Sequence, residues 1–380
     1  MKPNIFRFAT KELSQDGFFT WLLQWADNDH NQQNQLLNET AKDFVRLLLG
    51  QTPDYIINKV EAGRQWNNID IWAEINDEYF IGIEDKTNTG EHSEQLERYK
   101  QIATEHYKDK NHKLVFVYLK TGNESSATLK KVIEKGYSTI DRRAILNVLN
   151  QREVHNDILN DFKEYLIAIE NQTNSHTKFE NIISDWKAGE GFFIKLQELI
   201  SEWSDWRYVA NQTGGFLGFW YHWNEIEECS IYIQIENSFD YGIKLILKVS
   251  DWKPSTDLLY EILGEMKPYA QKNGLSIIKP DKYRAGETST LAIVENAFTV
   301  DNDGNLELEK FVETLKALEK TIDEYCEEIN TAGNRVGCPT RKSGGENLSH
   351  HCTYGSRIQR FVKYQYFRSF HRKYLCFNLR

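Results

Sequence analysis

Cysteine, proline and long apolar runs are all scarce in this chain of 380 residues. Its five cysteines all lie after residue 228, and their odd number and irregular spacing argue against a disulfide framework. No apolar run approaches the ~20 residues that a membrane helix needs, and the first residues lack the apolar stretch of a secretory signal. We therefore expect a cytoplasmic protein without a membrane segment.

An excess of positive charge is also lacking. The chain has 46 Lys and Arg against 56 Asp and Glu, which gives a net charge of −10. The imbalance is uneven, because residues 335–380 contain ten Lys or Arg and one acid, Glu346. An acidic body is a poor non-specific binder of polyanions, so any contact with nucleic acid must be local.

Apolar spacing predicts the order of the elements in the first part of the chain. Two segments with helical periodicity come first, then three alternating or β-branched segments, a helix, a short continuous apolar run and further helices. The continuous run is typical of a strand that is covered on both faces. The order predicts an α/β (α+β) domain with a central mixed sheet flanked by helices. The predicted segments are helices at 18–26 and 36–49, strands at 55–60, 69–75 and 79–84, a helix at 92–107, a strand at 114–119, and helices at 128–134, 142–149 and 156–169.

The polar stretch 171–177 contains no large apolar residue, so we place a domain boundary there. This divides the chain into a first domain at 1–173, a second α+β domain at 177–330 and a basic tail at 331–380. A disordered tail, a nucleic-acid-binding extension and an out-of-frame read remain open for the last segment. In the second domain we expect helices at 192–203, 258–272 and 308–329, strands up to 249, and strands at 275–278 and 291–299.

Two neighbouring strands carry the residues that indicate chemistry. Side chains in a strand alternate, so Glu84 and Lys86 share one face while the isoleucines before them point to the other. On the preceding strand, Ile69, Ile71, Ala73 and Ile75 share a face and Asp70 points away from it. A hairpin that matches the isoleucine faces through the three residues 76–78 pairs Ile75 with Tyr79, Ile71 with Ile83 and Asp70 with Glu84.

Two directly opposed carboxylates, about 5 Å apart at Cβ, repel each other unless a cation lies between them. A hard divalent ion with oxygen ligands is the simplest such cation, and a lysine beside it can act on water or offset phosphate charge. A carboxylate two residues before a lysine is by itself a weak signal. It also occurs at Asp161/Lys163, Asp185/Lys187, Asp251/Lys253 and Glu265/Lys267, where no alternating strand with an opposed Asp precedes it.

The spacing that combines Asp70, Glu84-x-Lys86 and Gln95-x-x-x-Tyr99 resembles the active site of the PD-(D/E)xK nuclease superfamily, the fold of many restriction endonucleases. The branch with a glutamine–tyrosine helix is the most similar, and Gln95 and Tyr99 lie on one helix face. The opening helix, with Glu12 and Asp16, resembles one that carries an acid toward the site. The similarity covers about residues 10–120, and Ile69 stands where a proline is common.

This resemblance implies a restriction-endonuclease-like fold and a nuclease that depends on Mg²⁺, with Mn²⁺ as an alternative. Asp70 and Glu84 would ligate the metal with the backbone carbonyl of Asp85, and Lys86 would act on the attacking water. Gln95 and Tyr99 would orient the site or contact the nucleic-acid backbone. Glu12 and Glu61 are weaker candidates for a further acidic group. The partner would be nucleic acid, with DNA expected, and a homodimer is left open.

Other interpretations stay open beside this one. The chain could be an inactive nuclease-fold binding module, although it retains the full set Asp70, Glu84 and Lys86, or a regulatory protein that acts through its aromatic second domain. Aromatic side chains there could stack on bases, although core packing is the commoner role. The aromatic residues are Trp203, Trp206, Tyr208, Phe216, Phe219, Trp220, Tyr221 and Trp223. Zinc is disfavoured, because Cys338, His350, His351, Cys352 and Cys376 form no Cys-x-x-Cys pair.

Overall fold

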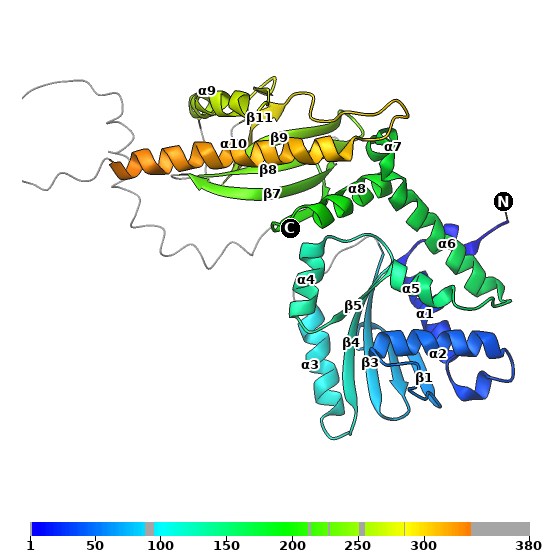
Figure 1. Ribbon diagram of the computed structural model, residues 1–380. Helices are drawn as coiled ribbons and strands as arrows, with labels where there is room; N and C mark the ends of the chain where they lie inside the picture. Colours follow the sequence, from blue (N-terminus) through cyan, green and yellow to red (C-terminus); the bar gives the residue numbers. More distant parts are fainter. Residues whose placement is uncertain are drawn as a thin grey trace, which may run out of the picture. The chain divides into compact units, whose positions relative to one another are not determined.

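The computed structural model describes residues 2–87, 95–211, 214–226, 229–250, 255–284 and 286–335, of which 330 and 332–335 are described by their backbone only. Residues 1–332 group into one compact unit. The basic segment 336–380, with Cys338, His350, His351, Cys352 and Cys376, lies outside the described residues. Two separate sheets run through the compact unit (Figure 1).

The first sheet is mixed, as the sequence predicts. Its strands follow the order β1-β2-β3-β4-β5, in which β1, β2 and β3 are antiparallel neighbours and β4 and β5 continue parallel to β3. The strands are β1 (Val60–Trp66), β2 (Ile69–Ile75), β3 (Tyr79–Lys86), β4 (Lys113–Lys120) and β5 (Ser138–Asp141). The helices are α1 (Glu12–Gln24), α2 (Gln35–Leu49), α3 (Gln95–Tyr107), α4 (Ser126–Glu134), α5 (Arg142–Leu149) and α6 (Asp157–Asn174), with 3₁₀ turns at Ile5–Arg7 and Asn28–His30.

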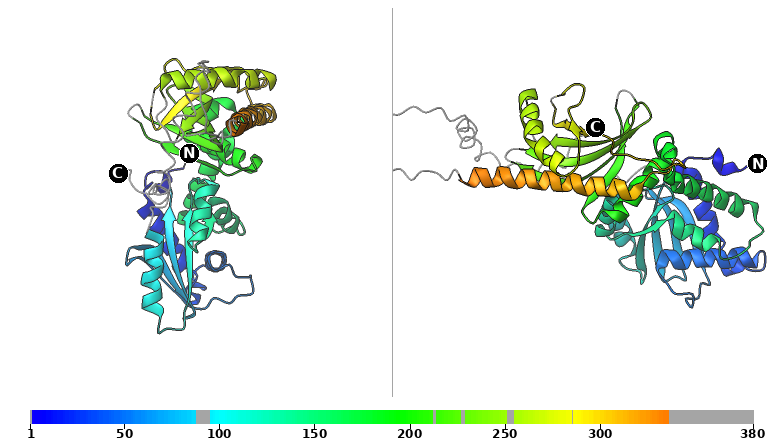
Figure 2. Two further views of the ribbon diagram at one scale, coloured as in Figure 1. Left: turned by 90° about the vertical axis from the view of Figure 1, so that its left-hand side faces the viewer. Right: turned by 45° about the horizontal axis from the view of Figure 1, so that its top comes forward.

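Helices cover both faces of this sheet, which explains why β3 and most of β4 are buried (Figures 1 and 2). On one face, Ile71, Ile81 and Ile83 pack against α1, α2, α5 and α6. On the other, Phe80, Phe116 and Tyr118 pack against α3 and α4. The alternation of the two strands therefore separates two cores, and the side chains of Glu84 and Lys86 belong to the second face.

The sequence misplaces the first strand and one isoleucine. Segment 55–60 was predicted to be a strand, but β1 begins only at Val60, because residues 55–59 are held by the side chain of Asn76 instead of a strand. Ile69 was assigned to the face of Ile71 and packs instead with Phe80. Gln65, which stands opposite Asp70 in this register, has a left-handed backbone and is not among the paired residues, so the β1–β2 ladder is irregular at this end.

The second sheet is antiparallel, with the order β10-β11-β9-β8-β7-β6. Its inner face packs against α8, α9 and α10 around Phe193, Ile233 and Phe311. The strands are β6 (Ser204–Val209), β7 (Phe216–Ile226), β8 (Cys229–Ser238), β9 (Gly242–Ser250), β10 (Ile277–Ile278) and β11 (Thr288–Val294). The helices are α7 (Phe179–Ser184), α8 (Trp186–Leu199), α9 (Thr256–Lys272) and α10 (Leu308–Arg335).

The expected polar boundary at 171–177 is helical. Helix α6 continues to Asn174, and a 3₁₀ turn spans Ser175–Thr177. The segment is polar because all of it except Thr173 is at least partly exposed to solvent, and the buried Thr173 lies in a hydrogen-bond cluster. The division into two domains at this point remains a prediction. Among the described helices, none is long and apolar enough to cross a membrane.

Candidate active site on the first sheet

The hairpin of β2 and β3 has the register that the isoleucine pattern predicts. Ile75 pairs with Tyr79 and Ile71 with Ile83, which brings Asp70 next to the end of β3. The regular ladder ends at Ile71, and the backbone N–H of Asp85 donates to Asp70 Oδ2 at 3.1 Å. Main-chain and side-chain groups of the two strands therefore fix the Asp70 carboxylate beside Glu84.

Lys86 lies between the two carboxylates. Its Nζ is 2.5 Å from Glu84 Oε1 and 3.7 Å from Asp70 Oδ2. Glu84 and Lys86 are buried, whereas Asp70 is partly exposed, so the group opens to solvent on the side of Asp70. Burial strengthens the ion pairs, because little water screens these charges.

Gln95 and Tyr99, on the first turns of α3, point at the same group. Gln95 Nε2 donates to Glu84 Oε1 at 2.9 Å and to Tyr99 Oη at 2.7 Å. Tyr99 is buried in the second core of the sheet. The i, i+4 spacing therefore places the Gln95 amide against the Glu84 carboxylate and the Tyr99 hydroxyl against the Gln95 amide.

Asp85 points the other way and contacts α1. Its Oδ1 accepts a hydrogen bond from Gln15 Nε2 at 2.5 Å, and its carboxyl group lies against that of Asp16. Thr121 donates to Gln15 Oε1 at 2.6 Å, so the amide of Gln15 joins β3 to the residue after β4. The side chain of Asp85 is thus a buried structural group, and a contribution of its backbone carbonyl to a metal site stays a prediction.

Glu12 and Glu61 have different positions. Glu12 Oε1 accepts the backbone N–H of Thr87 at 3.0 Å, and its charge acts on Asp70 and Lys86. Glu61 is exposed on β1, where it pairs with Glu74 away from this group. The first helix therefore brings one acid, Glu12, next to the hairpin, whereas Glu61 is a polar surface residue.

The carboxyl groups here have raised pKa values because they are buried. Burial, reinforced by the charge of Asp70, raises the pKa of Glu84 to about 7, and burial raises the pKa of Asp70 as well. Burial also raises the pKa of Asp16 to about 6 and that of Asp85 well above its ordinary value. Burial lowers the pKa of Lys86, but the neighbouring Glu84 and Asp70 outweigh it, so its net pKa is raised. These carboxyl groups therefore keep their protons to a higher pH than exposed carboxyl groups do.

The oxygen atoms of Asp70 and Glu84 suit a divalent cation. Glu84 Oε2 is buried and has no hydrogen-bond donor within the described ranges. Mg²⁺ needs only one or two protein carboxylates, because water and phosphate complete its ligands. No group of three or more His, Cys, Asp or Glu side chains in the described part of the chain is arranged to hold a metal ion. The residues therefore fit a two-carboxylate site and do not fit a closed protein cage.

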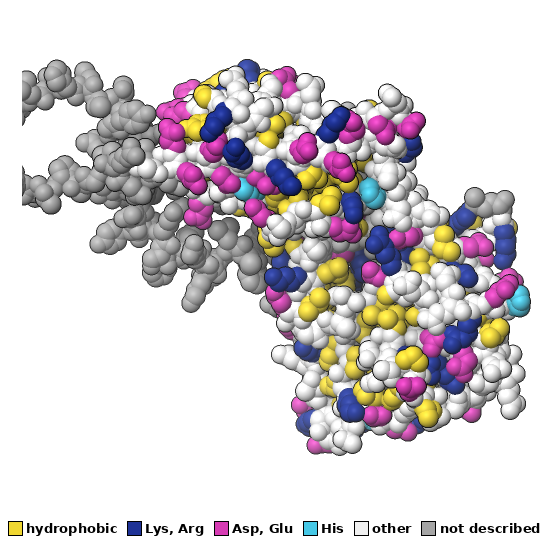
Figure 3. Space-filling model, in the orientation of Figure 1, with side chains coloured by type: hydrophobic (Ala, Val, Ile, Leu, Met, Phe, Trp, Pro, Cys, Tyr) yellow, Lys and Arg dark blue, Asp and Glu magenta, His cyan; other side chains and the backbone are white. Residues whose placement is uncertain are grey.

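The other candidates from the sequence lie elsewhere. Trp206, Phe219 and Tyr221 are buried in the core of the second sheet and cannot stack on bases. Trp203 and Tyr208 are half exposed, and Trp223 stacks on Tyr232 with ring centroids 3.8 Å apart. On the face drawn in Figure 3, Lys and Arg side chains are interspersed with Asp and Glu. The described surface on this face forms no broad basic band.

One residue beside the site is not among those that the sequence patterns indicate. Lys120 ends β4, is buried, and forms an ion pair with Glu124 at 3.2 Å. Its position directly after the apolar run 114–119 was a usable signal, because a lysine at a buried strand end needs a partner. The sequence does not give the parallel register that places Lys120 next to Lys86.

Residues 3–186 match the family model of the PD-(D/E)XK nuclease superfamily. This part of the chain belongs to that superfamily, and its mixed sheet flanked by helices agrees with the fold. No curated protein and no solved structure matches the chain. Members of the superfamily are generally nucleases that use divalent metal ions, so nucleic acid is the substrate class that the match indicates.

Proposed function

We propose that the chain is a Mg²⁺-dependent nuclease that hydrolyses phosphodiester bonds in DNA, with its site at Asp70, Glu84 and Lys86. The observation that carries the proposal is the position of Lys86 Nζ within 4 Å of both carboxylates at the end of β3. Charged groups converge there from two strands and one helix, which is the arrangement expected where charge develops during a reaction.

Asp70 and Glu84 would hold the ion, which supplies an activated water and a positive charge for the phosphoryl oxygens. The Asp85 N–H holds Asp70 in place, and the Gln95 amide orients Glu84 by donating to Oε1. Lys86 Nζ can hydrogen-bond the attacking water and offset the charge of the phosphate. Since the neighbouring carboxylates outweigh burial and raise the pKa of Lys86 overall, it acts as an ammonium group, a donor rather than a base.

Incubation of the full chain with plasmid, linear and single-stranded DNA, each with and without Mg²⁺, tests the proposal. We expect cleavage that requires the ion. Lys86→Met should reduce the rate by about 10² to 10³, because one positioned donor at a developing charge contributes ~3–4 kcal/mol. Asp70→Asn should abolish cleavage and also weaken metal binding measured by calorimetry.

Lys267→Met is the matched control. Lys267 follows Glu265 at the same spacing, but it is exposed on helix α9, so this variant should cut DNA like the wild type. Wild-type protein that binds DNA but cuts nothing with Mg²⁺ or Mn²⁺ would replace the nuclease by a binding module. Undiminished cleavage by Asp70→Asn would refute the assigned site. RNA in place of DNA as the better substrate would correct the substrate and leave the site.

A further inference from the structure

A cavity of about 440 Å³ lies at the carboxyl ends of β4 and β5, one strand away from Lys86. Its walls are the ends of these two strands, the first turns of α4 and α5, and one side of α8. In open sheets with parallel strands, ligands commonly bind at this edge. Helix α8 begins at Trp186, so its wall lies almost entirely beyond the residues that match the nuclease family.

The strand register connects this cavity with the candidate active site. Lys86, Lys120 and Asp141 occupy matching positions on β3, β4 and β5. Matching residues on adjacent strands point to the same face and lie about 4.8 Å apart in the backbone. Lys120, which lines the cavity, therefore stands beside Lys86 on the face where Glu84 lies.

Lys120 is a buried cation in the wall of the cavity. Its side chain is only 4% exposed, and Glu124 is its ion-pair partner at 3.2 Å. Burial, with the nearby charge of Lys187, lowers the pKa of Lys120 despite Glu124. An additional negative group in the cavity would strengthen the charged form, because opposite charges favour ionisation.

The remaining lining favours a ligand of mixed chemistry over a simple anion. Lys120, Arg142 and Arg143 place cations around the cavity and Glu124, Asp141 and Glu198 place carboxylates there, so a bare phosphate would leave the carboxylates without a donor. Hydroxyl and amino groups would instead donate to these carboxylates. Leu129 and Ile194 add apolar surface. The combination of a phosphate, a hydroxylated sugar and a flat base matches all three kinds of wall, and the volume suits a small ligand.

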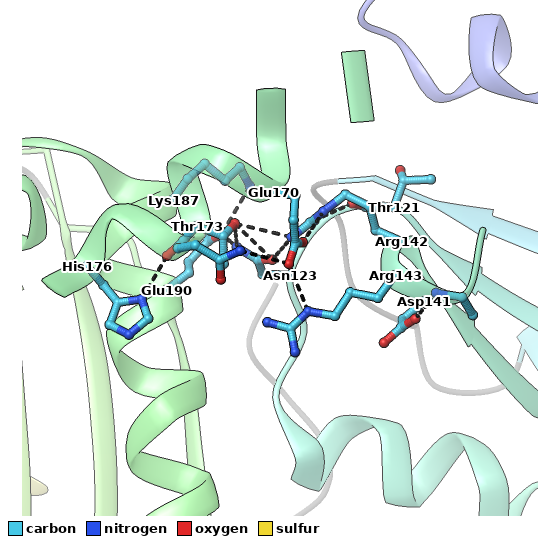
Figure 4. Close-up of polar contacts among 12 residues, drawn as sticks. Thr121, Asn123, Asp141, Arg142, Arg143, Glu170, Thr173, His176, Lys187 and Glu190 are labelled. Atoms are coloured by element: carbon cyan, nitrogen blue, oxygen red, sulfur yellow. Dashed lines mark hydrogen bonds and ion pairs between the residues drawn. The ribbon is translucent and has the colours of Figure 1, made fainter. Parts of the chain in front are cut away.

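Figure 4 shows why the walls are firm. Arg142 donates to the Thr121 carbonyl at 2.6 Å and to Asn123 Oδ1 at 2.9 Å, and its guanidinium pairs with Glu170 at 2.8 Å. Asn123 Nδ2 in turn donates to Glu190 Oε2 on α8 at 2.8 Å. The loop after β4 is thus bonded to both α6 and α8, so the cavity is held open by satisfied hydrogen bonds.

We propose that this cavity is a nucleotide subsite that holds the nucleotide next to the scissile phosphate, with Lys120 at that nucleotide's phosphate; its relation to cleavage rests on the proposed nuclease function. The wall formed by Ile194 and Glu198 gives α8 a part in choosing the substrate. A nuclease site at the end of β3 and a subsite at the end of β4 would fix both the position and the direction of the bound DNA strand.

Binding of deoxynucleoside 5′-monophosphates to the full chain, measured by calorimetry, tests the subsite directly. Wild-type protein should bind, and Ile194→Trp, which fills the cavity, should weaken binding at least tenfold. Leu199→Trp is the matched control, because Leu199 lies on the same helix, is exposed and does not line the cavity. The double variant Lys120→Met/Glu124→Gln, which removes both charges of the ion pair, should lose the preference for the monophosphate over the nucleoside.

Kinetics with a short single-stranded DNA separate this proposal from the nuclease itself. Ile194→Trp should raise KM about tenfold and leave kcat unchanged. Wild-type cleavage combined with an unchanged KM and no monophosphate binding would overturn the subsite while the nuclease stands. Monophosphate binding that Ile194→Trp abolishes, in a protein that cuts nothing, would support the nucleotide site and reject the nuclease. Equal binding by Ile194→Trp and Leu199→Trp would place the nucleotide elsewhere.

Discussion

Gly122, which directly follows Lys120 and Thr121 in the chain, has almost no space for a side chain. A Cβ built there would lie 1.9 Å from the backbone oxygen of Thr87. Gly122→Ala must therefore separate the ends of β3 and β4. We expect the free energy of unfolding to fall by ~1–3 kcal/mol or more, as for other overpacked positions, in urea titrations followed by circular dichroism. The displaced strand end carries Lys86, so cleavage should fall as well.

The control for this substitution is Gly264→Ala on α9. A Cβ at Gly264 would meet nothing within 4 Å, and the residue is exposed within a helix. Alanine should stabilise this helix by ~0.5–1 kcal/mol, because it loses less backbone entropy than glycine. Equal destabilisation by both alanines would mean that the strand ends do not approach each other as described.

Glu170 makes stability depend on pH. Burial raises its pKa, but hydrogen bonds from Arg143 and Arg142 outweigh burial, so the pKa in the folded protein is lowered. A carboxyl group whose folded pKa is depressed stabilises the fold above its unfolded pKa of about 4.3, and this contribution is lost as the pH falls through the folded value. Glu170→Gln should therefore lose ~1–3 kcal/mol at pH 7 and lose less in acid.

Denaturation midpoints of the wild type and of Glu170→Gln between pH 3 and 7 measure this difference in stability. The comparison variant is Glu198→Gln, whose ion pair with Lys195 on α8 is exposed. Exposed pairs contribute little, so Glu198→Gln should follow the wild-type curve at every pH. A constant gap between Glu170→Gln and wild type from pH 3 to 7 would show that the titration of Glu170 has no part in stability.

At the scale of elements, the turn between β2 and β3 sets the register of the candidate site. Asn76 and Asp77 both have left-handed backbones, with φ of 55° and 54°. The Asn76 side chain accepts the N–H groups of Asn58 and Lys59 at 2.9 and 3.1 Å and donates to the Ile56 carbonyl at 2.8 Å. One side chain therefore holds both the hairpin turn and the segment before β1.

Substitutions at this turn should separate the contribution of the Asn76 hydrogen bonds to stability from that of the left-handed backbone. Asn76→Gly keeps the left-handed backbone and removes the hydrogen bonds, and we expect a loss of ~1–3 kcal/mol. Asn76→Ala adds the cost of a left-handed alanine, about 1 kcal/mol more. Asp77→Gly should be neutral or stabilising, because glycine suits φ of 54° and the ion pair of Asp77 with Lys59 is exposed. Chemical denaturation of the three variants measures the order, and equal stability of Asn76→Gly and wild type would contradict it.

The sequence predicted the parts of this fold that depend on periodicity. Alternation placed β2 and β3 and paired Ile71 with Ile83, since a slip of one residue would turn the isoleucines outward. Contacts that depend on tertiary placement could not be read in this way. Segment 55–60 has the composition of a strand, but the Asn76 side chain takes its backbone groups. Strand β5 is too short, at four residues, to show a period.

The residues of the candidate site also divide into those that the sequence pattern predicts and those that it does not. Asp70, Glu84 and Lys86 follow from strand parity, and Gln95 with Tyr99 follows from helical spacing. Lys120 did not follow, because the parallel register of β3 and β4 depends on the helix between them. The tight contact between Asp85 and Asp16 was also hidden, since nothing in a sequence shows that two acids far apart share one buried position.

At the scale of the whole compact unit, a series of helices beginning with α6 connects the two sheets. Helix α6 passes through the polar segment 171–174, and its buried Thr173 accepts a hydrogen bond from Arg142 at 3.2 Å. We expect a broad-specificity protease at low concentration to leave residues 171–174 uncut, because helical backbone does not fit a protease cleft. Gln172→Pro, at an exposed position in the last turns of α6, should create a cleavage there, and mass spectrometry of the fragments identifies it. Early cleavage of the wild type at 171–174 would contradict the helical structure of this segment.

The same helix limits where this chain could be divided and rejoined by recombination or by protein engineering. A splice placed in the polar segment would remove Thr173 from Arg142, and a foreign second half would lack the Glu190 to which Asn123 donates. A chimaera that kept α6 and α8 with the first sheet would preserve both bonds, but any new strands from β6 onward would have to pack against α8 residues such as Phe193. The smallest part of the chain that keeps both hydrogen bonds therefore ends after α8, some 25 residues beyond the place where composition changes.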